Sequence, residues 1–170
     1  MCGIAGYIGI KNLKSEILNK VCKALYHRGP DENDIWLDQE CNIGFAHTRL
    51  SIQDLSKNGS QPMFSNNSKF VIIFNGEIYN HFDLRKTLDQ SNKSIGWKGS
   101  SDTETLLTCL SNWGMTKTLS EVNGMFSFAL WDKKERVLTL ARDRMGEKPW
   151  YYGWLEKTFI FGSEVKALRK

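Results

Sequence analysis

The sequence has no long apolar run. Its longest runs, FVIIF at 70–74 and FALW at 128–131, are far shorter than the roughly 20 residues that a helix needs to cross a bilayer. The N-terminus lacks the positive region that precedes a secretory apolar segment. Cysteine at position 2 also excludes myristoylation, which requires glycine there. We therefore expect a cytoplasmic protein with no membrane partner.

Clustered metal ligands and blocks of like charge are also missing. The four cysteines contain no CxxC pair, and no His–Glu or Cys–His cluster has the spacing of metal ligands, so we expect no metal and no disulfide framework. The 23 Lys and Arg residues interleave with 19 Asp and Glu residues to give a net charge of +4. Without a long basic block, nucleic acid is an unfavoured partner.

Common nucleotide-binding and hydrolase motifs are absent. GIAGYIG does not match G-x-G-x-x-G, and there is neither a P-loop nor a G-x-S-x-G elbow. The chain shows no repeat, low-complexity tract or linker. With 170 residues, 41% of them hydrophobic, it has the length and composition of one globular domain.

The first half of the chain alternates predicted strands, a helix and loops. A short strand at 2–9 precedes a helix whose apolar residues recur from 13 to 25, and Gly29-Pro30 ends that pattern. Residues 35–52 have strand character, and a loop follows at 55–63.

The second half contains the most distinctive local signals. The run KFVIIF at 69–74 predicts a buried strand, which the turn dipeptide Asn75-Gly76 is expected to end. Ser101 and Glu104 form a capping-box pattern that opens a helix, and Gly114 stands where that helix should end. The other predicted elements are a helix at 81–90, a mobile loop at 91–100, and two hairpins pairing 125–132 with 136–143 and 150–155 with 158–163. The pattern predicts a single α+β domain.

Cys2 is the most informative candidate for chemistry. Gly3 and the small Cys2 favour removal of Met1, which would leave a free α-amine on Cys2. That amine titrates near pH 8 in peptides, so it can act as a general base within one residue of the thiol. The alternative is that Cys2 is a small hydrophobic strand residue. A Cys–His pair using His27, His47 or His81 is weakly supported, because none lies in a nucleophile motif.

Eight segments of the chain occur together in an order that is characteristic of one family. They are CGIAGYIG, HRGPDE, GFAHTRLSIQDLS, QPM, FNGEIYNH, SSDTETLL, GMFSFALWD and ARDRMGEKPWYYG. Over essentially all of residues 1–170, the chain resembles the N-terminal glutaminase domain of glutamine-hydrolysing asparagine synthetases. This resemblance implies a class II glutamine amidotransferase of the N-terminal nucleophile hydrolase type. Its expected fold is a four-layer αββα sandwich of two antiparallel sheets.

The resemblance also implies roles for the reacting groups. Cys2 is the expected nucleophile that attacks the side-chain amide of glutamine, releases ammonia and leaves a glutamyl thioester for hydrolysis. Asn75 and Gly76 match the oxyanion hole, where a side-chain NH₂ and a backbone N–H can face the developing charge. The residues alone leave open that Asn75-Gly76 is only a turn.

The implied substrate pocket recognises the two charged ends of free glutamine. Arg49 matches the residue that binds the α-carboxylate, a task suited to a bidentate guanidinium. Asp102 and Glu77 match positions that meet the α-amino group, although Asp102 could instead stabilise a helix N-terminus. The remaining expected pocket residues are Leu50, Ser51, Ile52 and Gln53.

The chain departs from the family in two respects. Trp150, Met145 and Glu147 are local variants outside the expected pocket. The synthetase domain, with its S-G-G-x-D-S type loop, is absent from this sequence. We expect ATP and Mg²⁺ only in that domain and no cofactor in this one, and we expect a synthetase domain or subunit as partner, with homo-oligomers also possible.

The leading hypothesis is therefore glutamine hydrolysis that supplies ammonia for ATP-dependent amidation, as in asparagine biosynthesis. A first alternative is an amidotransferase whose acceptor is another carboxylate, such as a sugar acid. A second is a non-catalytic module that senses glutamine, which the intact Cys2, Asn75 and Gly76 disfavour. Nucleic-acid binding through KPWYYGWLEK is the weakest, because that segment has the pattern of a hairpin.

Overall fold

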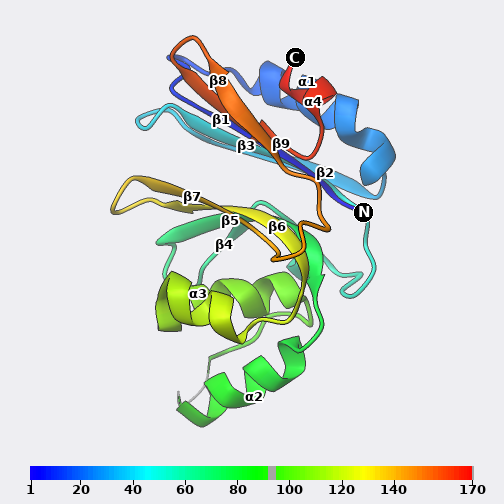
Figure 1. Cartoon of the computed structure of the whole chain (residues 1–170), viewed down its shortest axis with the longest axis vertical. Coiled ribbons are helices and arrows are strands. Elements are labelled where there is room, and N and C mark those ends of the chain that lie inside the picture. The colour runs from blue at the N-terminus through cyan, green and yellow to red at the C-terminus, as the bar shows by residue number, and fades with distance from the viewer. Residues whose placement is uncertain (92–94, 170) are drawn as a thin grey trace.

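The computed structural model describes residues 1–91 and 95–169, which form two stacked antiparallel sheets between helices (Figure 1). The first sheet has the order β2-β3-β1-β9-β8, and the second has the order β4-β5-β6-β7. The first sheet consists of β1 (Gly3–Ile8), β2 (Glu32–Asp38), β3 (Ile43–Arg49), β8 (Tyr151–Leu155) and β9 (Thr158–Gly162). The second consists of β4 (Met63–Phe64), β5 (Phe70–Ile78), β6 (Gly124–Asp132) and β7 (Val137–Arg142).

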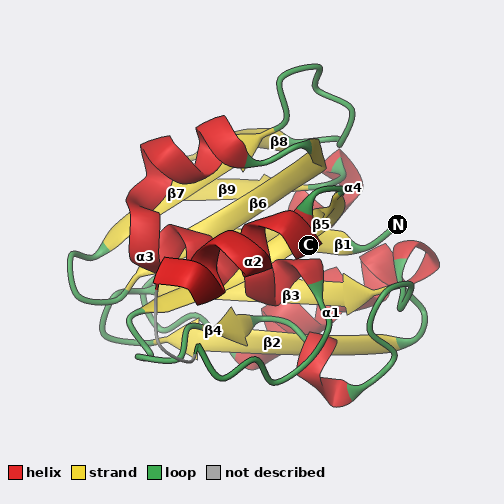
Figure 2. Cartoon of the chain, turned by 90° about the horizontal axis from the view of Figure 1, so that it is seen from below, coloured by secondary structure: helices red, strands yellow, loops and turns green. Residues whose placement is uncertain are grey.

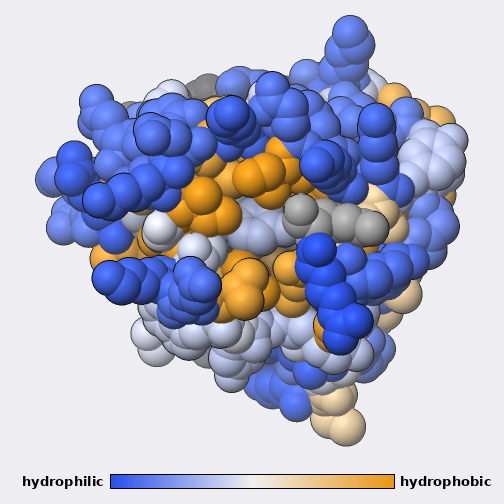
Figure 3. Space-filling view, turned by 90° about the horizontal axis from the view of Figure 1, so that it is seen from above, coloured by the Kyte–Doolittle hydropathy of each residue, from blue (hydrophilic) through white to orange (hydrophobic). Residues whose placement is uncertain are grey.

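Helices cover the outer face of each sheet. Helices α1 (Ser15–Leu25) and α4 (Val165–Leu168) lie on the first sheet, and apolar surface shows between hydrophilic side chains on that face of the molecule (Figure 3). Helix α3 (Asp102–Glu121) lies on the second sheet, and α2 (His81–Ser91) packs against α3 (Figure 2). The expected four-layer α+β sandwich is confirmed. Among the described residues, no helix is long and apolar enough to span a membrane.

The two faces of β5 are both buried, which explains its continuous apolar run. Val71 and Ile73 pack with the first sheet between the layers, whereas Ile72 and Phe74 pack against the helices. Because side chains alternate along a strand, Asn75 belongs to the face that looks toward the first sheet.

The prediction of a turn at Asn75-Gly76 is wrong. β5 continues through both residues to Ile78, and Asn75 pairs with Ser127 of β6 while Gly76 pairs with Phe126. A Cβ on Gly76 would lie 2.3 Å from the carbonyl oxygen of Met125. This glycine therefore permits close approach of two strands, and pairing with β6 overrides the turn preference of the dipeptide.

Two other predictions need correction. The strand region at 35–52 is divided between β2 and β3, and Asn42 has a positive φ of 53° in the turn between them. Gly114, with φ 77° and ψ 176°, kinks α3, but helical residues resume and continue to Glu121. In the predicted loop, residues 95–100 have no helix or strand, and 92–94 lie outside the described residues.

Of the two hydrogen bonds in the predicted capping box of α3, only the one accepted by Ser101 is present. Ser101 Oγ accepts a hydrogen bond from the Thr103 backbone N–H at 3.1 Å, so the serine caps the helix. Glu104 instead accepts hydrogen bonds from the backbone N–H groups of Lys98 (2.8 Å) and Gly99 (3.0 Å). The glutamate therefore holds the preceding loop rather than the cap residue.

Candidate active site

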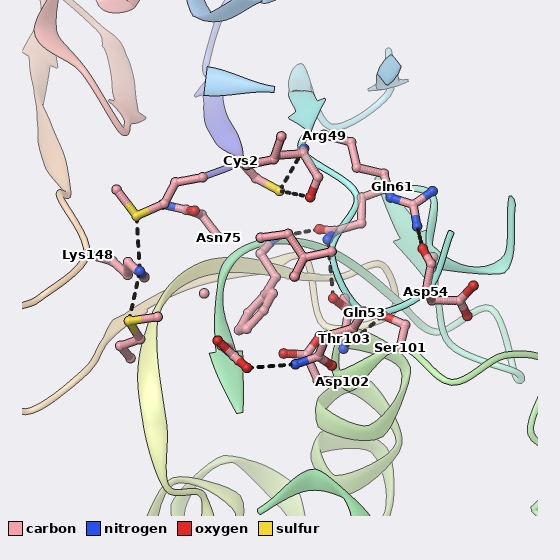
Figure 4. A pocket seen from close by; sticks show the side chains of 18 residues that line it. Cys2, Arg49, Gln53, Asp54, Gln61, Asn75, Ser101, Asp102, Thr103 and Lys148 are labelled. Carbon is pink, nitrogen blue, oxygen red and sulfur yellow. Dashed lines mark hydrogen bonds between the residues drawn. The ribbon is translucent and has the colours of Figure 1, made fainter. Parts of the chain in front are cut away.

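One pocket lies where the N-terminus, the end of β3, the middle of β5 and the start of α3 meet (Figure 4). It brings together nine of the ten residues expected in the site, from segments far apart in the sequence. Those nine are Cys2, Arg49, Leu50, Ile52, Gln53, Asn75, Gly76, Glu77 and Asp102.

Cys2 is held at the pocket by the segment that follows β3. β1 pairs with β3 in a register that sets Gly3 opposite Thr48, so Cys2 reaches the end of that strand. The backbone N–H of Leu50 donates a hydrogen bond to Cys2 Sγ at 3.4 Å, and Sγ lies 3.8 Å from the Leu50 carbonyl oxygen. Burial raises the pKa of the Cys2 thiol, and the Leu50 N–H partly opposes this effect. A base is therefore needed to form the thiolate near neutral pH.

Asn75 presents an unpaired amide to the pocket. Its side chain is 1% exposed, and its Nδ2 has no hydrogen-bond partner in the described part of the chain. A buried amide without a partner costs free energy, which a ligand oxygen at this position would recover. An NH₂ group in this state can donate to an oxyanion as that charge develops.

The backbone of β5 supplies a second donor beside Asn75. The N–H of Phe74 donates to Gln61 Oε1 at 2.6 Å, and the N–H of Ile78 donates to Asp102 Oδ2 at 2.9 Å. Backbone N–H groups of residues i and i+2 point to the same side of a strand. The Gly76 N–H therefore points to the same side as the N–H groups of Phe74 and Ile78, away from β6. Gly76 lines the pocket, so its N–H and the Asn75 NH₂ are two neighbouring hydrogen-bond donors available to a ligand oxygen.

Asp102 is a buried carboxylate at the start of α3. It is 7% exposed, and no Lys, Arg or His nitrogen of the described residues lies within 4.0 Å of it. Burial raises its pKa to about 6, although the Ile78 N–H favours the charged form. A positively charged ligand group would compensate this carboxylate. Both roles considered for Asp102, helix terminus and pocket residue, are thus compatible with its position.

Arg49 lines the pocket but already has protein partners. Its Nη1 lies 3.1 Å from Glu32 Oε2 and donates to the Ser56 carbonyl oxygen at 3.0 Å, and its Nη2 donates to the Asp54 carbonyl oxygen. Its side chain is 9% exposed. These contacts fix the guanidinium in one orientation at the pocket wall.

Of the four expected pocket residues that follow Arg49, all but Ser51 line the pocket. Ile52 is 71% exposed at the pocket, and Gln53 Nε2 donates to Glu77 Oε1 at 3.2 Å. Ser51 does not line the pocket, and its N–H donates to Asp31 Oδ2 at 2.7 Å. The structure thus separates Ser51 from the other expected residues, because its backbone turns toward the loop before β2.

Several pocket residues were not expected. Gln61 Nε2 donates to Thr103 Oγ1 at 3.2 Å, so this glutamine bridges β5 and α3 across the pocket wall. Gln61 belongs to the QPM segment and Lys148 to the segment ARDRMGEKPWYYG. Both segments contribute to the resemblance, but neither indicates a role for these two residues in the pocket. The remaining additional lining residues are Met1, Asp54, Gly59, Phe74, Ser101, Thr103 and Met125.

The fold resembles that of a solved amidotransferase, and one family model matches the chain over its full length. The glutamine phosphoribosylpyrophosphate amidotransferase of B. subtilis has a similar fold, with a TM-score of 0.81 and 20% sequence identity over 99% of this chain and 43% of that one. Residues 1–170 match the family model described as a glutamine amidotransferase domain. The chain belongs to this glutamine amidotransferase domain family.

Curated relatives show which members of this family the chain resembles. Asparagine synthetase [glutamine-hydrolyzing] 3 of Bacillus subtilis is 38% identical over 99% of this chain and 27% of its own length. The amidase chry2 of Gibberella zeae is 31% identical over 98% of this chain and 26% of its own length. The resemblance to asparagine synthetases is thus confirmed, and the chain spans about a quarter of the length of each of these two relatives.

Proposed function

We propose that this domain hydrolyses glutamine to glutamate and ammonia through Cys2. The observation that supports this most strongly is a buried Asn75 amide without a partner in the pocket that holds the Cys2 thiol. The purified chain is expected to release ammonia and glutamate from glutamine in equal amounts. Binding of glutamine without release of either product would support the sensing module instead.

The chemistry follows from groups that the pocket contains. After removal of Met1, the neutral α-amine of Cys2 accepts the thiol proton, and Sγ attacks the amide carbon of glutamine. The resulting oxyanion is stabilised by Asn75 Nδ2 and Gly76 N–H. The amine then returns its proton to the departing nitrogen, which leaves as ammonia. Water attacks the glutamyl thioester, releases glutamate and restores the thiol.

The two ends of the pocket suit a free amino acid. We assign the α-amino group of glutamine to Asp102, whose carboxylate has no cationic partner among the described residues, and to the neighbouring Glu77. We assign the α-carboxylate to Arg49. A peptide-bound glutamine lacks both charges, so it would leave a buried carboxylate uncompensated.

Glutamine affinity is expected to depend on the protonation of Asp102. Burial raises its pKa to about 6, so below that pH the carboxyl is increasingly neutral and no longer attracts the ammonium of glutamine. In a Cys2→Ala variant, which cannot turn over, calorimetry should show affinity that is constant above pH 7 and falls about tenfold for each pH unit well below 6. Asp102→Asn should bind weakly at every pH. Unchanged affinity from pH 7 to 4.5 would contradict the role of Asp102.

Arg49→Ala is expected to raise the KM for glutamine by about thirtyfold or more, which corresponds to at least about 2 kcal/mol for loss of a buried charge pair. The kcat at saturating glutamine should fall much less, because the carboxylate is remote from the reacting carbon. The Tm should also fall, since Arg49 holds Glu32 and Ser56. The exposed Arg144→Ala serves as the control. An unchanged KM in a folded Arg49→Ala protein would remove Arg49 from the pocket.

We further propose that the ammonia serves an ATP-dependent amidation in a synthetase domain or subunit. The names of the asparagine synthetase relatives and the small share of their length that this chain covers support this proposal. The domain described here would itself need no cofactor, and its reduced thiol suits the cytoplasm. The amidase relative supports a second candidate, an acceptor other than aspartate. Assays of acceptor amidation with the synthetase partner, ATP and Mg²⁺ would separate the two.

A further inference from the structure

Lys148 is a buried lysine in the pocket of the proposed nucleophile, Cys2. The proposed reaction assigns no role to this lysine. It follows β7 in the chain, is 4% exposed, and lines the pocket with Cys2 and Asn75 (Figure 4). Its Nζ lies 3.0 Å from Met125 Sδ and 3.1 Å from Met1 Sδ. Thioether sulfur is a weak acceptor, and buried ammonium groups ordinarily pair with carboxylates. No carboxylate of the described residues lies within 4.0 Å of this one.

Met1 separates Lys148 from the position of the catalytic amine. The Met1 side chain extends from the residue before Cys2, and its Sδ contacts Lys148 Nζ. Removal of Met1, on which the proposed function rests, deletes this thioether and creates the α-amine of Cys2 at the end of the shortened chain. The new amine then belongs to a residue that lines the same pocket as Lys148.

The lysine is held in place from its backbone. Asp143 Oδ2 accepts hydrogen bonds from the N–H groups of Lys148 (3.1 Å) and Phe126 (3.2 Å), and Asp143 Oδ1 accepts one from Glu147 at 2.8 Å. This links the segment that carries Lys148 to β6, which pairs with the strand of the oxyanion hole. Loss of Met1 therefore leaves the anchor of Lys148 unchanged.

Other charges near Cys2 are already paired or lie across the pocket. Arg28 Nε donates to the Cys2 carbonyl oxygen at 3.0 Å, but its Nη1 is paired with Glu164 at 3.1 Å. Arg49 is paired with Glu32, and Lys148 has no such partner in the part of the chain that is described. The charged groups that line the pocket are Arg49, Asp54, Glu77, Asp102 and Lys148.

We propose that Lys148 is a positioning residue of the glutaminase site, whose buried ammonium faces the uncovered amine of Cys2 and keeps that amine neutral, as a proton acceptor must be. A nearby like charge disfavours protonation, and the effect is strong where solvent is excluded. The proton that leaves the thiol can then be taken up near neutral pH. In this way Lys148 acts on the reaction through the base without touching the reacting carbon.

The test compares the processed protein with its Lys148→Met variant. Methionine keeps the length and the packing against Met125 but removes the charge. With ¹³C-labelled cysteine, the Cα signal of Cys2 reports titration of the α-amine directly. We expect the midpoint to rise by about one pH unit, and kcat at saturating glutamine to fall about fivefold at pH 7 and return to the parental value by pH 9. Lys148→Arg should keep the parental midpoint, and the exposed Lys157→Met is the matched control.

An unchanged midpoint in a folded Lys148→Met protein would overturn the proposal, as would an equal loss of kcat at every pH. The measurement remains decisive if the parental protein does not hydrolyse glutamine. In that case the proposed function fails, while the titration of the amine still shows whether Lys148 acts on it.

Discussion

Replacing Cys2 by alanine is expected to abolish glutamine hydrolysis, with a loss in kcat of about 10⁴ or more. The reason is that the pocket offers no second thiol: of the four cysteines, only Cys2 lines it among the described residues. The side chain is half-buried at the end of a strand, so its truncation should leave the Tm within a few degrees of the parental value. Release of ammonia and thermal unfolding measured on the same preparation check both statements.

Cys41→Ala is the matched control, because Cys41 is also half-buried but lies outside the pocket. It should hydrolyse glutamine at the parental rate. Hydrolysis by a folded Cys2→Ala protein at more than a hundredth of that rate would show that the nucleophile is another group.

The same mechanism requires that Cys2 be the first residue. In the chain that retains Met1, the Met1 side chain lines the pocket and contacts Lys148, and the nitrogen of Cys2 is part of a peptide bond. A chain extended so that processing cannot expose Cys2 should therefore be as inactive as Cys2→Ala. Intact mass spectrometry confirms the N-terminus of each preparation. A normal rate from the extended chain would contradict the use of the α-amine as base.

Asn75→Asp is expected to lower kcat at least 10²- to 10³-fold, about 2.7 to 4 kcal/mol, with a much smaller change in KM. The substitution removes the NH₂ donor and puts a carboxylate beside the developing negative charge. An Asp-Gly dipeptide would preserve a turn, but β5 runs straight through this position, so turn formation gives no reason for asparagine here. Steady-state kinetics on protein of verified fold measures the effect.

A second variant separates repulsion from loss of the donor. Asn75→Ala removes the NH₂ without adding charge and should lose about 10²-fold in kcat, less than Asn75→Asp. Asn33→Asp, at an exposed asparagine of β2, is the control and should keep the parental kcat. Should Asn75→Asp retain more than a tenth of the parental kcat, Asn75 is not an oxyanion donor.

The sequence by itself determined most of the local structure and predicted which groups react. Apolar periodicity located α1 and α2, and β-branched and aromatic runs located β5 and the hairpins of β6 with β7 and β8 with β9. These features follow from interactions between neighbouring residues, which a single sequence displays. The motifs likewise indicate Cys2, Asn75 and Asp102 as site residues.

Only the tertiary structure decided how those residues are arranged and buried. Asn75-Gly76 is a strand and not a turn because β6 approaches so closely that a Cβ at Gly76 would collide with Met125. Asp102 has a raised pKa because folding buries it, and Ser51 is excluded from the pocket because its N–H is bonded to Asp31. Lys148 meets Met1 across nearly the whole length of the chain. Pairing, burial and charge compensation depend on partners distant in sequence, so local patterns could not specify them.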